Sequence, residues 1–212
     1  MLILGLETAT RNCSVALLRD GEIIAHHHQV GKAIHSEILP ELIATITQQG
    51  QLLPELNAIA VSIGPGSYTG LRIGLATAKG MAFPRQLPIL PVPTLAALEM
   101  NARRQWSAPL VLFIKSHRNL VYYITSANRD DFVLNRPVQH APFDEILAVF
   151  PGYMLIGDAP ELAPAGSIQE CLPDAREIAL IGYHYYDQLL PLSRPDLEPA
   201  YHSNLELKGW QA

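Results

Sequence analysis

The run Gly64-Pro65-Gly66-Ser67-Tyr68-Thr69-Gly70 holds the residue types best suited to chemistry in this sequence. It stands between an apolar run and a helical pattern, and glycine-rich turns of this kind let backbone N–H groups approach a phosphate. Leu71 and Arg72 follow where a Walker A loop has Lys and Ser or Thr. The residues around Ser67 do not form a Gly-x-Ser-x-Gly nucleophile elbow. A phosphate cradle and a structural turn both remain open interpretations.

A second polar segment, Glu7-Thr8-Ala9-Thr10, closes the first apolar run. Either Glu7 stands beside a phosphate and its metal, or the segment is a hairpin turn whose hydroxyls cap backbone groups. No acidic residue can be assigned as the catalytic group of a kinase, so no catalytic residue is predicted. The residues predicted for a nucleotide or phosphate loop are Glu7, Thr8, Thr10, Gly64, Gly66, Ser67 and Thr69.

The histidines do not predict a metal centre. In the run His26-His27-His28, only the outer two share a side if the run is a strand, and metal sites usually need a third ligand at a defined spacing. His35 opens the next helical pattern, but Leu39 stands where the second histidine of a pair would be. We therefore predict no metal.

The helical pattern after the glycine run is rich in small residues, among them Gly70, Gly74, Ala76, Thr77 and Ala78. A glycine inside a helix costs about 1 kcal/mol relative to alanine, so these glycines need a structural reason. Close packing on the protein's own sheet explains them, and so does a helix interface with another chain. The two explanations are compatible, because opposite faces of one helix can serve both.

Apolar periodicity predicts the order strand–strand–strand–helix–strand–helix twice. The first set is expected at 2–8, 13–19, 22–30, 35–49, 57–63 and 70–83, and a proline-rich link leads to a further helix at 94–104. The second set is expected at 110–115, 120–126, 131–139, 143–150, 153–157 and 176–190. This duplication predicts two α/β domains, 1–104 and 105–212, with a cleft between them, which is the plan of the actin, hexokinase and Hsp70 superfold.

Charge and composition limit the classes of function. The chain has 212 residues, of which 49% are hydrophobic, and a formal net charge of −5. Nucleic-acid binding draws most of its affinity from basic side chains, so this chain is a poor candidate for binding RNA directly. Two cysteines do not form a disulfide framework, and no signal peptide or membrane-spanning run is recognised. We expect a cytoplasmic protein that reaches RNA only through a partner.

Several segments, in order, resemble one known family. The most specific is GPGSYTGLRIG at 64–74; LGLETAT at 4–10, CSVAL at 13–17 and HSE at 35–37 precede it, and Pro93-Thr94-Leu95 follows it. Together they resemble the TsaB (YeaZ) family over about residues 1–100. The second half resembles the family in layout and in Pro199-Ala200-Tyr201.

The resemblance implies an actin-like (ASKHA) fold and a role in making threonylcarbamoyladenosine (t6A) at position 37 of tRNAs that read ANN codons. It implies a non-catalytic partner or activator, not an enzyme, beside a paralogous metal-binding transferase (TsaD). A P-loop ATPase (TsaE) and tRNA would be met only through that complex. The chain itself would require no cofactor, and ATP or ADP is an option at the subunit junction. The lone His35 agrees with this role, because the transferase carries a His pair on its first helix.

The resemblance also implies where the partner binds. In the family, two helices pack on the equivalent helices of the transferase, and the same surface can form homodimers when the chain is alone. Here these helices are 35–49 and 70–83. The implied interface residues are His35, Ile38, Leu42, Gly70, Arg72, Ile73, Gly74, Thr77 and Met81.

One segment departs from the family. Lys115-Ser116-His117-Arg118 stands where the family commonly has an Asp-Ala-Arg run, so we expect a divergent surface on the second domain.

A rival hypothesis is an active ATP-dependent enzyme of the actin-like superfold, such as a small-molecule kinase. The glycine run and Glu7 motivate it.

Overall fold

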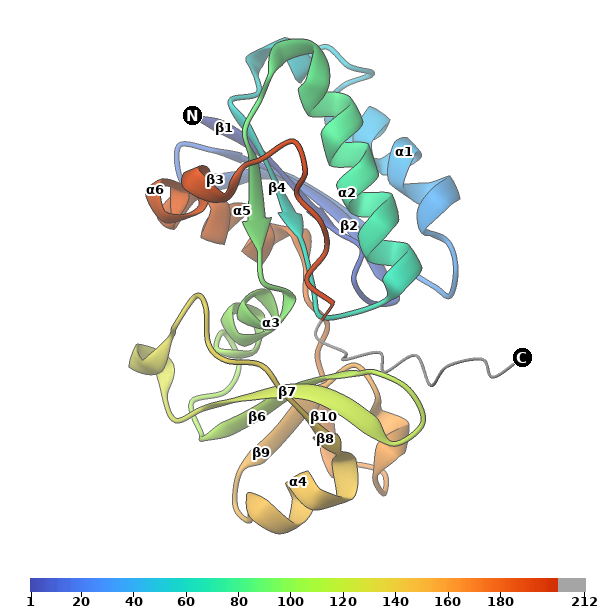
Figure 1. Ribbon diagram of the computed structural model, residues 1–212, viewed down its shortest axis with the longest axis vertical. Helices are drawn as coiled ribbons and strands as arrows, with labels where there is room; N and C mark the ends of the chain where they lie inside the picture. The colour runs from blue at the N-terminus through green and yellow to red at the C-terminus, as the bar shows by residue number, and fades with distance from the viewer. Residues whose placement is uncertain (202–212) are drawn as a thin grey trace, which may run out of the picture.

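Two mixed β-sheets with the same strand order organise the chain, of which the computed structural model describes residues 1–201 (Figure 1). The first sheet has the order β3-β2-β1-β4-β5 and the second β8-β7-β6-β9-β10. In each sheet the first strand along the chain is central, antiparallel to the second and parallel to the fourth. The duplicated α/β arrangement expected from the sequence is confirmed.

The strands follow the apolar runs of the sequence closely in most places. The first sheet contains β1 (Leu2–Glu7), β2 (Asn12–Arg19), β3 (Glu22–Val30), β4 (Ala58–Ser62) and β5 (Ile89–Val92). The second contains β6 (Leu110–Lys115), β7 (Leu120–Ser126), β8 (Gln139–Pro142), β9 (Met154–Gly157) and β10 (Ile168–Glu170). Every residue of β1 and β4 is buried, as expected for strands with continuous apolar runs and helices on both faces.

Helices cover both faces of the first sheet. α1 (His35–Ile46) and α2 (Tyr68–Ala82) lie on one face and share one apolar cluster with β1, β2 and β4. α5 (Ala175–His184) covers the opposite face. A side chain at Gly5 would collide with the backbone oxygen of Ala175, so glycine there lets α5 lie directly on β1.

The closing helix differs from its prediction. The expected single helix at 176–190 is wrong: α5 ends at His184, and α6 (Tyr186–Leu189) and a 3₁₀ turn (Leu190–Leu192) follow. The break places Leu189 in the same cluster as the apolar residues of α5 beneath the first sheet. α5 belongs to the second half of the chain but packs on the first sheet. The domain boundary between residues 104 and 105 stays a prediction.

One strand prediction needs correction, and two strands were not predicted. The strand expected at 131–139 is wrong: a 3₁₀ turn at Arg129–Asp131 comes first, and β8 begins only at Gln139. Proline cannot donate to a strand ladder, and Pro137 lies in the expected strand. Leu134 and Phe132 instead pack into the cluster beneath the first sheet. β5 lies in the proline-rich link, where no strand was expected, and it pairs with β4. β10, which pairs with β9, was not expected either.

The remaining helices connect and cover the second sheet. α3 (Thr94–Ala102) lies between the two sheets (Figure 1) and contributes side chains to the clusters on both sides. α4 (Phe143–Val149) packs on the second sheet through Phe143 and Ile146. Within residues 1–201, no helix is long and apolar enough to cross a membrane.

The helices expected at 35–49 and 70–83 are confirmed as α1 and α2, with shifted ends. α1 ends at Ile46 because Gln48 and Gln49 adopt left-handed backbone conformations. α2 begins at Tyr68, and the Ser67 hydroxyl caps it by accepting a hydrogen bond of 3.2 Å from the Gly70 N–H. The glycine run is therefore the turn that starts α2.

The small residues of α2 have two different surroundings. A side chain at Gly70 would collide with the backbone oxygen of Thr8, and one at Gly74 with the Thr8 hydroxyl. A side chain at Gly80 would meet nothing within 4 Å. The first two glycines therefore serve close packing inside this chain, which was one of the two explanations left open by the sequence.

We predict opposite effects of the same substitution at two of these positions. Gly70→Ala should destabilise the protein by roughly 1–3 kcal/mol or more, because Thr8 must move. Gly80→Ala should stabilise it by about 1 kcal/mol, because alanine favours the helix and finds open space. Urea unfolding of both variants measures the difference, and equal changes in unfolding free energy would contradict the assigned packing.

Candidate functional site

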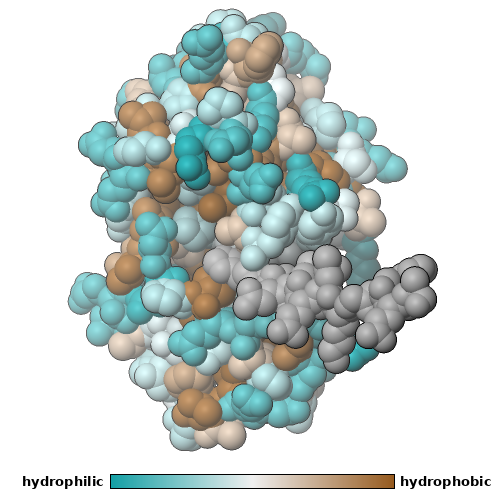
Figure 2. Space-filling view, viewed as in Figure 1, coloured by the Kyte–Doolittle hydropathy of each residue, from teal (hydrophilic) through white to brown (hydrophobic). Residues whose placement is uncertain are grey.

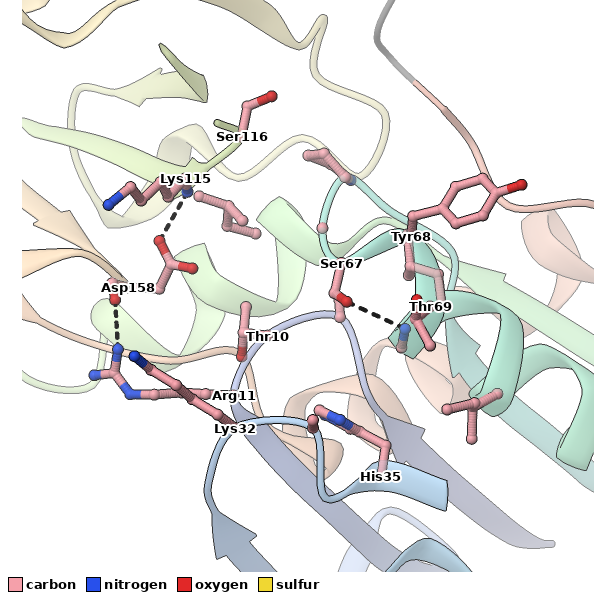
Figure 3. A pocket seen from close by; sticks show the side chains of 18 of the residues that line it. Thr10, Arg11, Lys32, His35, Ser67, Tyr68, Thr69, Lys115, Ser116 and Asp158 are labelled. Carbon is pink, nitrogen blue, oxygen red and sulfur yellow. Dashed lines mark hydrogen bonds between the residues drawn. The ribbon is translucent and has the colours of Figure 1, made fainter. Parts of the chain in front are cut away.

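A cleft of about 1060 Å³ opens between the two sheets, on the side where β1, β4, β6 and β9 end (Figure 3). Its walls come from the β1–β2 turn, the segment before α1, the glycine run, the end of β6, the residue after β9 and Ala200–Tyr201. Because parallel strands of both sheets end at this place, the duplicated topology itself creates the cleft.

Backbone hydrogen bonds fix the glycine run in one wall. The Ser67 N–H donates to the Ala9 oxygen at 2.7 Å. At the other end, the Gly64 N–H donates to the Thr94 hydroxyl at 3.0 Å and the Gly64 oxygen accepts from the Thr94 N–H at 2.8 Å. A side chain at Gly66 would collide with Ala9. The run is therefore held between the β1–β2 turn and the start of α3.

The residues predicted for a phosphate loop divide into two groups. Thr10, Gly66, Ser67 and Thr69 line the cleft. Glu7, Thr8 and Gly64 are buried and are not among its lining residues. The structure therefore brings hydroxyl and backbone groups to the cleft and keeps the acidic residue out of it.

Glu7 is fully buried at the end of β1. Its Oε1 accepts a hydrogen bond of 2.5 Å from the Ala9 N–H, and its Oε2 has no hydrogen-bond partner among residues 1–201. Burial raises the pKa of the Glu7 carboxyl to about 8. The side chain is therefore uncharged at neutral pH and stabilises the turn that begins at Ala9.

Charged side chains that the sequence analysis did not select also line the cleft. Arg11 comes from the β1–β2 turn, Lys32 from the segment before α1, and Lys115 and Asp158 from the ends of β6 and β9. Asp158 could have been found from the sequence, because it directly follows an expected buried strand and the ends of parallel strands share one edge. Lys115 was recognised only as a departure from the family.

These charges are held by specific contacts. The Lys115 N–H donates to Asp158 Oδ1 at 2.8 Å, and burial raises the pKa of Asp158 to about 6. Arg11 Nη1 donates to the Asp158 backbone oxygen at 2.6 Å, and the same guanidinium forms an ion pair with Glu170. Lys115 Nζ lies 2.6 Å from Glu161. Arg11 thus ties a turn of the first sheet to two strand ends of the second.

The predicted interface residues also divide into two groups. His35, Gly70 and Gly74 are buried; His35 and Gly70 line the cleft, and Gly70 and Gly74 pack against Thr8. Ile38, Leu42, Ile73 and Met81 are half-buried on α1 and α2 and pack against the apolar cluster beneath these helices, and we call these four residues the α1–α2 seam. Thr77 is half-buried on α2.

Arg72 is the exposed polar member of the predicted interface. Its guanidinium carbon lies 4.1 Å from the centre of the Tyr68 ring, and its Nε donates to the Tyr201 hydroxyl at 2.9 Å. The Ala200 N–H donates to the Ile63 oxygen at 2.7 Å and fixes the segment that carries Tyr201. An ordered cluster of one arginine and two tyrosines therefore stands beside the first turns of α2.

The histidine strand has a structural contact. His26 Nε2 lies 3.0 Å from Asp174 Oδ1, and the His26 and His28 rings stack with centres 5.2 Å apart. Asp174 caps α5 by accepting from the Arg176 N–H. Over residues 1–201, no group of three His, Cys, Asp or Glu side chains could hold a metal ion.

We predict that Glu7 gives the protein a pH-dependent stability. Its folded pKa of about 8 exceeds the ordinary value of 4.5, so the free energy of unfolding should fall by up to several kcal/mol as the pH rises from about 4.5 to about 8. Glu7→Gln should flatten this fall. Urea unfolding of both proteins between pH 6 and pH 8 measures the effect, because the other titrating groups are the same in the two; parallel pH curves would contradict it.

Comparison with known proteins places this architecture in a family. The family model of tRNA N6-adenosine threonylcarbamoyltransferase (TsaD) matches residues 24–141, which is more than half of the chain. The tRNA threonylcarbamoyladenosine biosynthesis protein TsaB of Escherichia coli (strain K12) is 38% identical over 131 residues, 62% of this chain and 57% of that protein. TsaB of Haemophilus influenzae is 35% identical over 137 residues, 62% of this chain and 58% of that protein. The matched region thus spans less than two thirds of these relatives.

Solved structures give the same result for the fold. A Pseudomonas aeruginosa protein with similarity to the peptidase YeaZ superposes with a TM-score of 0.78 at 25% identity, covering 94% of this chain and 98% of that one. YeaZ from Pseudomonas aeruginosa superposes with a TM-score of 0.73 at 26% identity, covering 88% of this chain and 92% of that one. The chain therefore belongs to the TsaB (YeaZ) family, within the wider group that the threonylcarbamoyltransferase family model describes.

Proposed function

We propose that this chain is the non-catalytic partner or activator subunit of the complex that transfers threonylcarbamoyl to adenosine 37 of tRNAs reading ANN codons. The relatives named as t6A biosynthesis proteins support the pathway. The observation that carries the partner role is the α1–α2 seam, a row of half-buried apolar side chains on two neighbouring helices.

The seam suits a helix-to-helix interface. Exposed residues with small or polar side chains, Glu41, Thr45, Ala76 and Gly80, lie on the outer sides of α1 and α2. Arg72 and Tyr68 stand at one end, and arginine and tyrosine are enriched at the energetic centres of interfaces. Two helices from each partner can bury on the order of 1,600 Å², which is a standard interface size.

The family-model match suggests which partner fits this surface. Residues 24–141, which the transferase model matches, include α1, β4 and α2. A paralogous transferase built on the same plan presents equivalent helices, and like surfaces pair around an approximate two-fold axis. The same argument makes a homodimer the competing state when the transferase is absent. TsaE and tRNA would join only through this pair.

The face of the molecule shown in Figure 2 mixes apolar and polar residues. The net charge of −5 also makes direct tRNA binding by this chain alone unfavourable.

The rival proposal, an ATP-dependent enzyme of the same superfold, has weaker support. It needs an ionised carboxylate in the cleft to bind metal and activate a hydroxyl. Glu7 does not line the cleft, and Asp158 Oδ1 accepts the Lys115 N–H. ATP turnover by the purified chain, abolished by Asp158→Asn, would favour the rival.

Depletion of the protein in its own cells tests the proposed pathway. We expect t6A to disappear from digests of tRNA measured by liquid chromatography and mass spectrometry, and to return when the native chain is supplied. Unchanged t6A after depletion would contradict the proposal.

Two exposed alanines on helices offer a matched test of the interface. Ala76 lies on the outer side of α2, and Ala148 lies on α4 of the second sheet. Ala76→Arg should weaken binding to the TsaD-type transferase by about tenfold or more, because a charge enters the centre of the docked helices. Ala148→Arg should bind as the native chain does. Calorimetry measures both, and full binding by Ala76→Arg would place the interface elsewhere.

A further inference from the structure

The actin-like fold implies a magnesium nucleotide in the cleft, and the residues present do not fit one. Mg²⁺ prefers carboxylate oxygens and water as ligands. Among residues 1–201, Asp158 is the one carboxylate that lines the cleft, and its Oδ1 already accepts the Lys115 N–H at 2.8 Å. Glu7, at the end of β1, is buried behind the wall. The cleft therefore lacks the acidic pair that would hold the cation.

Cationic side chains line the cleft in which a Mg²⁺ site would need a pair of carboxylates. Arg11, Lys32 and Lys115 come from three different segments and line the same cleft. In Figure 3, Arg11 and Lys32 are seen on one side of Asp158 and Lys115 on the other. Lys32 is exposed and forms no ion pair within residues 1–201. The partner of Lys115 is Glu161, whose side chain is 61% exposed and can release it at small cost.

The facing wall supplies neutral donors. Ser67 caps α2 and Thr69 lies in its first turn; both are exposed and line the cleft, and the N-terminus of this 15-residue helix favours negative charge. Thr10 lines the cleft between these hydroxyls and Arg11 in Figure 3. Cations on one side and helix N–H and hydroxyl groups on the other are the usual surroundings of a bound phosphate.

A buried histidine at the same wall indicates a missing partner. His35 is 6% exposed and lines the cleft, and its Nε2 has no hydrogen-bond partner within residues 1–201. A buried polar atom without a partner is costly, and most such atoms in native proteins are paired. Burial lowers the pKa of His35, and hydrogen bonding to the backbone of Thr10 and Asn12 opposes this shift.

We propose that this cleft is a metal-free anion site, in which Lys32 and Lys115 bind a phosphate or diphosphate group against Ser67 and Thr69 at the start of α2. The ligand class is a small phosphorylated molecule, either an inorganic di-anion or a nucleoside diphosphate. The proposal concerns the cleft of the isolated chain and does not rest on the proposed partner role. A nucleotide bound in this cleft would be held by lysine side chains and not through a Mg²⁺ ion.

Calorimetric titration of the purified chain with inorganic pyrophosphate and with ADP tests the site. Each titration is made in EDTA and again in excess Mg²⁺. We expect both ligands to bind in EDTA and to bind more weakly with Mg²⁺, because the cation neutralises the charge that the lysines bind. Binding that requires Mg²⁺, or no binding of pyrophosphate in EDTA at millimolar concentration, would overturn the proposal. Binding of ADP without pyrophosphate would also overturn it.

Charge variants locate the binding within the molecule. Lys32→Glu and Lys115→Glu should each weaken pyrophosphate binding about tenfold or more, and Glu161→Gln should strengthen it by freeing Lys115. Arg129→Glu is the control, because Arg129 is exposed in the 3₁₀ turn after β7 and does not line the cleft. Circular dichroism of each variant checks folding, and exposed Lys32 gives a variant that should fold. An equal loss in Arg129→Glu would mean non-specific attraction and would contradict the site.

Discussion

Thr8 touches α2 at two successive turns, opposite Gly70 and opposite Gly74. This contact, together with the hydrogen bond from the Ser67 N–H to the Ala9 oxygen, holds the first half of α2 against the end of β1. Any side chain at these glycines would push the helix away from the sheet. The position of the helix in turn fixes one wall of the cleft and one side of the α1–α2 seam. A single close approach inside the first sheet therefore sets both surfaces to which we assign a function.

That approach explains why the glycine run first suggests a phosphate cradle and then a docking helix. The backbone of the run is largely used to bind the β1–β2 turn and the start of α3. What it offers to solvent is the outer face of α2 and the hydroxyls of Ser67 and Thr69. The two proposed surfaces meet on α2, because Tyr68 and Ile73 line the cleft and also belong to the proposed docking surface.

The sequence was informative where local pattern and tertiary packing agree. Continuous apolar runs located β1, β4 and β6, which are buried on both faces, and helical spacing located α1 and α2, which bury one face and expose the other. It failed where distant parts of the chain decide the outcome. Leu134 and Phe132 lie in a sequence pattern typical of a strand but pack beneath the first sheet. β5 lies in a proline-rich link and forms because β4 pairs with it in parallel. The candidate site shows the same limit. Ser67 and Thr69 could be selected by motif, whereas the meeting of Arg11, Lys32 and Lys115 depends on how two sheets face each other. The burial of Glu7 depends on α2 lying over the segment that follows it.

The central claim is that α1 and α2 form the surface on which a TsaD-type transferase docks. Hydrogen–deuterium exchange of this chain, alone and with the purified transferase, measures it most directly. The account predicts that slowed exchange on binding concentrates in His35–Ile46 and Tyr68–Ala82. Slowed exchange confined to the second sheet or to α4, with these two helices unchanged, would contradict it.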